Sequence, residues 1–169
     1  MKGTYKGRKI SALIEQFAGN EIHAAYGVNY AYWFGMDLIS WADKEDQDTN
    51  VHWKKWLKDN LDFELTNDNI FTMSILHELG HHYTQNMFSE EQWESESAAK
   101  DNISDEINDD NYEDQQMKYF DMPTERAATE WAVQIYNANK VAMKHWNKRF
   151  MCAIKHFEKK YNTYMFERI

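Results

Sequence analysis

Residues that interrupt regular structure are scarce in this sequence, which contains one proline and six glycines in 169 residues. So few of them favour long helices over a turn-rich all-β fold. Cysteine is equally scarce: Cys152 stands alone, so it can form no internal disulfide and is not expected to bind a metal. No apolar run is long enough to span a bilayer, and residues 1–30 lack the apolar core of a signal peptide. We therefore expect a cytoplasmic protein with no membrane partner.

Positive charge is also in deficit, with 19 Lys and Arg against 28 Asp and Glu and a formal net charge of −9. Because a positive field is needed to bind a phosphate backbone, we expect no nucleic-acid partner. Residues 89–116 hold eleven carboxylates and one lysine, Lys100, whereas residues 140–169 hold eight Lys and Arg and two Glu. We interpret the first segment as an exposed acidic insertion and the second as a solvated helix face. Docking of the two segments on each other, or of a protein partner on either, stays open.

The length and the 43% of apolar residues suit one domain spanning residues 1–169 with a real core. The pattern is mainly α, within an α+β class. Residues 21–41 are rich in Tyr, Trp, Val and Ile, which places a small N-terminal sheet there. Apolar residues at three- and four-residue intervals predict a long C-terminal helical region, in which Pro123 suits the first turn and Thr124 can cap. This region is one helix or two, with a break expected near residues 137–139.

One motif indicates chemistry, the pentapeptide His77-Glu78-Leu79-Gly80-His81. On a helix, residues four apart lie about 40° from each other around the axis, so His77 and His81 can present two neutral nitrogens to one Zn²⁺. Glu78 lies about 100° from His77, too far round to be the natural third ligand but well placed beside a metal-bound water. As a general base it would take a proton from that water, whose pKa the metal lowers to about 7. The resulting hydroxide would attack a peptide carbonyl.

The surroundings of the motif favour a buried metal-binding helix over two histidines that are merely satisfied in a core. Residues 66–69 offer capping side chains, and the apolar run 70–76 follows directly. Gly80 costs about 1 kcal/mol relative to Ala inside a helix, and close approach of another backbone would explain its presence. His82 is rotated about 100° from His81, so we expect it beside the site or at the surface rather than on the metal.

A zinc ion held by two imidazoles needs a third protein ligand while one position stays open for water. Glu125 and Glu130 compete for this role on the same helix. At 100° per residue, Glu125 lies about 60° from the centre of the apolar face and Glu130 about 160° from it, so we prefer Glu125. Asp121 is an outside alternative. The small residues Ala127 and Ala128 would let this helix approach the motif closely.

The motif, followed by Glu125, Ala128 and the pair Trp131-Ala132, resembles the ImmA/IrrE type of bacterial and phage metallopeptidases within the zincin group. In that family the HExxH helix is followed by a helix of the pattern E-x-E-A-N-x-F-A, whose Glu completes the zinc site. The resemblance covers roughly residues 68–90 and 120–138. It implies a zincin-like domain in which the motif helix packs on the C-terminal helical region. The zinc ligands that it implies are His77, His81 and Glu125, with Glu78 as the base.

Three positions depart from the family pattern: its second Glu is Ala127 here, its Asn is Thr129 and its Phe is Trp131. The acidic stretch after His82 also makes the gap between the two helices unusually long. Members of the family are typically intracellular endopeptidases, some of which cut the repressors of phages or mobile elements. The resemblance therefore implies a regulatory rather than a digestive role.

We therefore expect a zinc-dependent metallopeptidase that hydrolyses a cytosolic protein or peptide. One alternative is a non-catalytic zinc-stabilised module or inhibitor that binds a protein through its acidic segment. Another is a hydrolase of a non-peptide amide or ester, which the same site would support. The proton donor for the tetrahedral intermediate stays open among Tyr112, Tyr119 and His145.

Overall fold

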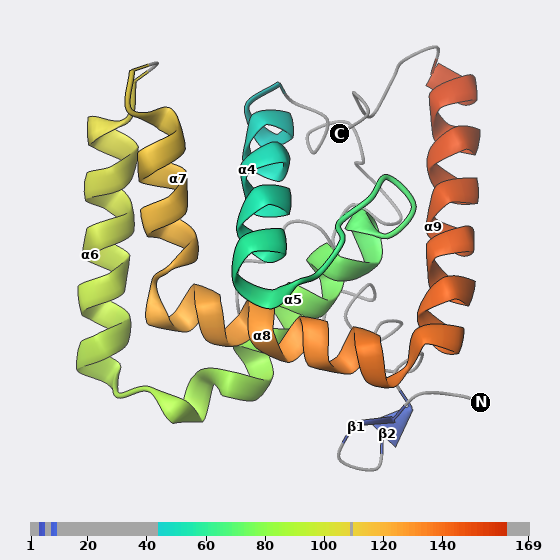
Figure 1. The fold of residues 1–169 in the computed structure, drawn as a ribbon, viewed down its shortest axis with the longest axis horizontal. Helices are drawn as coiled ribbons and strands as arrows, with labels where there is room; N and C mark the ends of the chain where they lie inside the picture. Colours follow the sequence, from blue (N-terminus) through green and yellow to red (C-terminus); the bar gives the residue numbers. More distant parts are fainter. Residues whose placement is uncertain (1–3, 6–7, 10–43, 109, 162–169) are drawn as a thin grey trace.

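The computed structural model describes residues 4–5, 8–9, 44–108 and 110–161, and most of these lie in helices (Figure 1). Two short strands, β1 (Thr4–Tyr5) and β2 (Arg8–Lys9), pair antiparallel. The prediction of a mainly α fold is confirmed for this part of the chain, while residues 21–41, where the sheet was expected, lie outside it. The helical elements are α4 (Lys44–Leu61), α5 (Ile70–Thr84), the 3-10 turn η2 (Gln85–Met87), α6 (Glu90–Glu106), α7 (Tyr112–Phe120), α8 (Pro123–Ala138) and α9 (Lys140–Tyr161).

Helices α5 and α8 cross in the middle of the molecule and form its most extensive contact (Figure 1). Five of the seven residues of α5 before its motif are apolar, and full burial of a Leu, Ile or Met side chain contributes about 1.5–3 kcal/mol. This burial anchors the helix, so its polar residues can be held in a defined place. The buried apolar side chains of the two helices are Ile70, Met73, Ile75, Leu76 and Leu79 from α5, and Ala128, Trp131, Ala132, Val133 and Ile135 from α8.

Gly80 is the point where the backbones of α5 and α8 meet. A Cβ atom built on Gly80 would lie 2.4 Å from the carbonyl oxygen of Ala128 and 2.8 Å from its Cα. Any side chain at position 80 would therefore force the two backbones apart. This contact confirms the prediction that a second backbone approaches Gly80, and it uses one of the two small residues that were expected to allow the approach.

The helix starts differ from the expected capping. Asn69 is the N-cap of α5, but its side chain forms no cap hydrogen bond. Instead, its amide binds the preceding loop, where Oδ1 accepts from the Thr66 N–H and Nδ2 donates to the carbonyl of Glu64. Pro123 is in the first turn of α8 as predicted, but the cap position is Met122, and Thr124 is already helical. The expected N-cap position of α5 is thus right for Asn69, but no side-chain cap forms there and Thr124 is not the cap of α8, because loop and interhelix partners take those polar groups.

The C-terminal helical region is divided at Asn139, between the end of α8 at Ala138 and the start of α9 at Lys140. The break lies where the sequence pattern placed it. The Asn139 side chain donates a hydrogen bond to the carbonyl of Ile135, one of the acceptors left open at the end of α8. A polar side chain therefore satisfies the helix end as the chain turns into α9.

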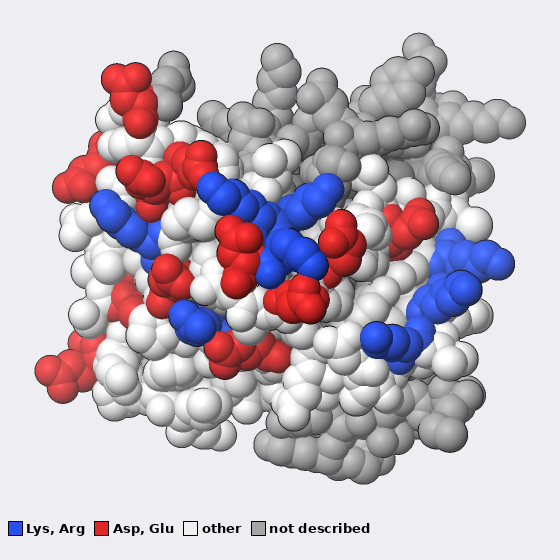
Figure 2. Space-filling model, in the orientation of Figure 1, with Lys and Arg blue, Asp and Glu red and all other residues white. Residues whose placement is uncertain are grey.

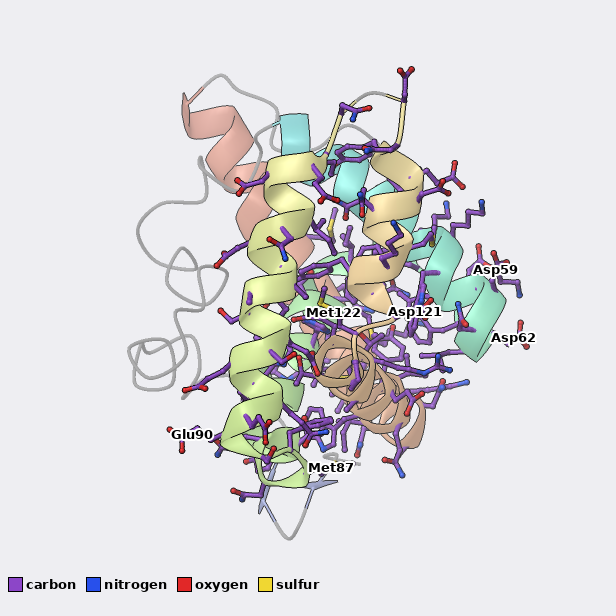
Figure 3. All side chains as sticks on the ribbon, turned by 90° about the vertical axis from the view of Figure 1, so that its left-hand side faces the viewer. Asp59, Asp62, Met87, Glu90, Asp121 and Met122 are labelled. Atoms are coloured by element: carbon purple, nitrogen blue, oxygen red, sulfur yellow. The ribbon has the colours of Figure 1, made fainter. Side chains whose placement is uncertain are left out.

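Residues 89–116, which were expected to form an exposed acidic insertion, are mostly helical and form α6 and the first half of α7. These two helices lie side by side and we call them the acidic hairpin (Figures 1 and 3). Ser89 begins α6 with a capping box in which Gln92 is the partner. The acidic hairpin and α9 lie at opposite ends of the molecule, and Figure 2 shows acidic residues at the first end and Lys and Arg at the other. The two segments therefore do not dock on each other within the described residues.

None of the described helices combines the length and the apolar character that a bilayer crossing requires.

Candidate metal centre

Three side chains from two helices converge on one point at the contact of α5 with α8. Nε2 of His77 lies 3.0 Å from Oε2 of Glu125 and 3.2 Å from Nε2 of His81. Nε2 of His81 lies 3.4 Å from the same carboxylate oxygen. The structure thus brings together the three residues that the sequence predicted as metal ligands. Among the described residues, no other group of His, Cys, Asp and Glu gathers in this way.

The triangle formed by these three atoms has the size that a metal ion requires. A tetrahedral zinc ion with bonds of about 2.0–2.1 Å separates its ligand atoms by about 3.3 Å. The three observed separations, 3.0, 3.2 and 3.4 Å, scatter around this value. Two imidazole nitrogens and one carboxylate oxygen also form a ligand set that zinc accepts while leaving a fourth position for water. The residues present therefore fit a zinc ion, although the same donors also suit other divalent metals.

Thr129 contacts His77 on the side of the ring that faces away from Glu125. Its hydroxyl oxygen lies 2.9 Å from Nδ1 of His77, and its side chain is almost fully buried. A partner on one ring nitrogen orients the imidazole, so this contact keeps Nε2 of His77 directed at Glu125, where it can donate to the carboxylate when it carries a proton or bind an ion when it does not. Sequence reasoning missed this role and noted Thr129 only as a departure from a family pattern. The spacing could have revealed it, because Thr129 follows Glu125 by four residues on the same helix face.

His81 lacks an equivalent partner, since its buried Nδ1 has no hydrogen bond within the described part of the chain. Aromatic rings surround it instead. The ring centroid of His77 lies 4.7 Å away and that of Trp93, on α6, lies 6.2 Å away. Packing therefore orients His81, whereas a hydrogen bond orients His77.

The acidic hairpin supplies two polar contacts to the first turn of α8. Nζ of Lys100 donates to Oε1 of Glu125 at 2.5 Å. One turn earlier on α6, Oε2 of Glu96 accepts from both the backbone N–H and the hydroxyl of Thr124, at 3.1 and 2.6 Å. Glu96 therefore provides the cap that Thr124 was expected to provide. Sequence reasoning missed both hairpin residues, because nothing in a local pattern indicates which helix α6 will contact.

Electrostatics favour an ionised Glu125. Burial opposes its ionisation, but hydrogen bonds to His77 and His81 outweigh that cost and hold the pKa of Glu125 well below its usual range. For His77, burial opposes protonation, yet the hydrogen bond to Glu125 and its negative charge outweigh burial and raise the pKa of the imidazole. A metal ion bound here would therefore replace a proton that Glu125 otherwise attracts to His77.

Glu78 lies beside this cluster without joining it. Burial raises the pKa of its carboxyl group, and the neighbouring imidazoles of His77 and His81 lower it by less. The net shift is upward, toward the neutral range in which a carboxylate works best as a general base. Its carboxyl group is close enough to both imidazoles to interact with their charge, but it is not one of the three side chains that converge.

The two rival ligands of the sequence analysis lie elsewhere. Glu130 is exposed and pairs with Arg126, whose Nε lies 3.0 Å from its carboxylate. Asp121 lies where α7 passes into α8 (Figure 3), and its carboxylate accepts a hydrogen bond of 2.9 Å from the indole of Trp56. The preference for Glu125 as the residue that faces the histidines is confirmed.

Of the three open candidates for a proton donor, Tyr119 is linked to the cluster through Lys100, whose Nζ lies 5.4 Å from the centroid of its ring. Tyr112 packs against His52, and His145 is exposed beside Trp146. The side chain of His82 lies outside the described part of the structure. Lys100 thus contacts both Glu125 and the Tyr119 ring.

Comparison with known proteins returns no match to any family model, curated protein or solved structure. The resemblance to ImmA/IrrE metallopeptidases therefore rests on the motif and on the residues of α8 alone.

Proposed function

We propose that this protein is a zinc-dependent metallopeptidase whose metal ligands are His77, His81 and Glu125. The observation that supports the proposal most strongly is the triangle of three donor atoms, with separations of 3.0, 3.2 and 3.4 Å. The spacing suits one tetrahedral ion, and the donor set suits zinc. The cofactor is thus one Zn²⁺ ion, and the substrate is a protein or peptide.

When bound, zinc lowers the pKa of a coordinated water to about 7 and polarises a carbonyl group. The chain supplies the rest. Glu78 takes the proton from the attacking water, and its raised pKa suits a group that must hold that proton briefly and then release it to the leaving amine. Thr129 binds Nδ1 of His77 and so orients the imidazole with Nε2 toward the place where the ion would be held.

Retention of Glu78 favours catalysis over a purely structural site, because a structural zinc site has no use for a half-buried carboxylate beside it. The resemblance to ImmA/IrrE proteins supports the same choice and suggests an intracellular regulatory substrate. Hydrolysis of a non-peptide amide or ester is the variant of this proposal that the same groups would also perform.

The test uses Glu78→Gln, which removes the basic carboxylate and keeps the side-chain volume. The wild type and the variant are loaded with zinc, their metal content is measured, and each is incubated with a library of peptides from a digested proteome. Mass spectrometry then detects newly formed peptide ends. Glu94→Gln, at an exposed position of α6, is the matched control.

We expect one zinc ion per chain in all three proteins. Cleavage by Glu78→Gln should fall by about 10²–10⁴-fold, while Glu94→Gln cleaves like the wild type. Equal cleavage by Glu78→Gln and the wild type would remove Glu78 from the mechanism. If the zinc-loaded wild type forms no new peptide ends, the non-catalytic binding module becomes the better account.

A further inference from the structure

The two oxygens of the Glu125 carboxylate contact different groups. Oε2 faces the Nε2 atoms of both histidines, at 3.0 and 3.4 Å. Oε1 faces away from them and accepts a hydrogen bond from Nζ of Lys100. A carboxylate can bind a metal through one oxygen or through both. An ammonium group on Oε1 leaves only Oε2 for an ion.

Residues 89–116 contain eleven acidic residues, and Lys100 is the one lysine or arginine among them. Its side chain is 28% exposed, and its Nζ lies 5.4 Å from the ring centroid of Tyr119. Removing an ammonium from water is costly unless a charged partner compensates. The partner is Glu125 of another helix, although several exposed carboxylates lie on α6 itself.

Glu96 fixes the position of Lys100 relative to Glu125. It precedes Lys100 by one helical turn, and its carboxylate binds the N–H and the hydroxyl of Thr124, the residue just before Glu125. Helix α6 therefore contacts two consecutive residues of α8, once with a negative and once with a positive group. These two contacts hold the ammonium against Oε1 rather than against another part of α8.

We propose that Lys100 is a positioning residue that keeps Glu125 a one-oxygen ligand and so keeps the fourth position of the metal ion open. The inference rests on the metal site of the proposed function but not on peptidase activity. Without the ammonium, Oε1 is free to turn onto the ion, which then gains a ligand where water and substrate must bind. Loss of Lys100 leaves metal binding intact and changes the coordination number.

Cobalt(II) in place of zinc reports this change, because the intensity of its visible absorption falls when its coordination rises from four to five ligands. The variants are Lys100→Met, which keeps an unbranched apolar chain, and Lys100→Arg, which keeps a cation. Lys118→Met removes a lysine that binds Gln115 on α7 and is the matched control. Circular dichroism verifies the fold of each variant, and titration gives its affinity for cobalt and zinc.

We expect Lys100→Met to bind one cobalt ion with an affinity within about threefold of the wild type. The visible absorption of its cobalt complex should be lower by about twofold or more. Lys100→Arg and Lys118→Met should keep the wild-type spectrum. If Lys100→Met does not fold, Lys100→Gln takes its place in the same comparison.

An unchanged spectrum in folded Lys100→Met would overturn the inference, as would a complete loss of cobalt binding, since Lys100 would then support binding itself. A loss of absorption in Lys118→Met equal to that in Lys100→Met would also overturn it. If the wild type binds neither cobalt nor zinc, the proposed function fails first and the inference fails with it.

Discussion

The pair of helices α5 and α8 and the acidic hairpin are built by opposite means. The pair is held by buried apolar side chains and by a backbone contact at Gly80 that leaves no room for a Cβ atom. The hairpin carries mainly exposed acidic residues, and it contributes to the candidate metal centre the ring of Trp93 beside His81 and two polar side chains, Glu96 and Lys100. Close packing thus places the three candidate metal ligands, whereas the polar contacts from the hairpin adjust the orientation of Glu125.

This difference separates two kinds of sensitivity. Changes in the packed pair should remove metal binding or the fold, because the ligands depend on a fixed distance between backbones. Changes in the hairpin should leave His77, His81 and Glu125 close together but alter how the Glu125 carboxylate is oriented toward a metal ion. The following substitutions compare the two regions, each with a counterpart on α6, on the outer face of α8, or where α8 meets the hairpin.

Glu125→Ala should have the largest effect on metal binding, because it removes a ligand and leaves His77 and Lys100 without their shared partner. We expect affinity for zinc to fall by more than about 100-fold, since loss of an outer contact to a ligand already costs about 10–100-fold. Isothermal titration with zinc gives the comparison. Glu130→Ala, on the outer face of α8, and Glu94→Ala, on α6, should each bind zinc like the wild type. Loss of zinc from Glu130→Ala with retention in Glu125→Ala would show that the ligand assignment is wrong.

Gly80→Ala should destabilise the protein, although alanine is normally the better helix former by about 1 kcal/mol. Its Cβ would lie 2.4 Å from the carbonyl oxygen of Ala128, and overpacking of this kind costs about 1–3 kcal/mol. Urea unfolding of the metal-free protein measures the change. The hairpin counterpart is Ala98→Gly at an exposed position of α6, which should lose only the helix-propensity term of about 1 kcal/mol. A Gly80→Ala variant that is more stable than the wild type would refute the close contact.

Thr129→Val should have the smallest of the three effects. Valine keeps the shape of threonine but cannot bind Nδ1 of His77, so we expect affinity for zinc to fall by about 10-fold. Thr129→Ser restores the hydroxyl and should restore most of the affinity. The counterpart is Thr124→Val, which loses one of two hydrogen bonds to Glu96 and should lower stability by about 1 kcal/mol with little effect on zinc. Equal zinc affinities for Thr129→Val and Thr124→Val would mean that Thr129 does not orient the ligand.

Helical geometry alone predicted the inward face of α8. Angles around the helix axis separated Glu125 from Glu130, and the structure places the first in the cluster and the second in solvent beside Arg126. The same geometry could have included Thr129, which shares the face of Glu125. Helical geometry could not have assigned Lys100 or Glu96 to the site. Both lie on α6, whose amphipathic pattern is too weak to show which neighbouring helix it contacts.

The sequence by itself was enough to find the motif, to prefer Glu125 over Glu130, to expect a close backbone contact at Gly80 and to place the helix break near Asn139. Each of these depends on helical periodicity or on the conformational properties of a single residue. Tertiary structure alone decided that the acidic segment takes part in the candidate metal centre. Lys100 precedes Glu125 by 25 positions in the sequence. The two residues meet because the chain leaves α6, runs back beside it as α7 and then enters α8. Contacts between residues so far apart depend on the path of the whole chain, and no local pattern of residue types encodes that path.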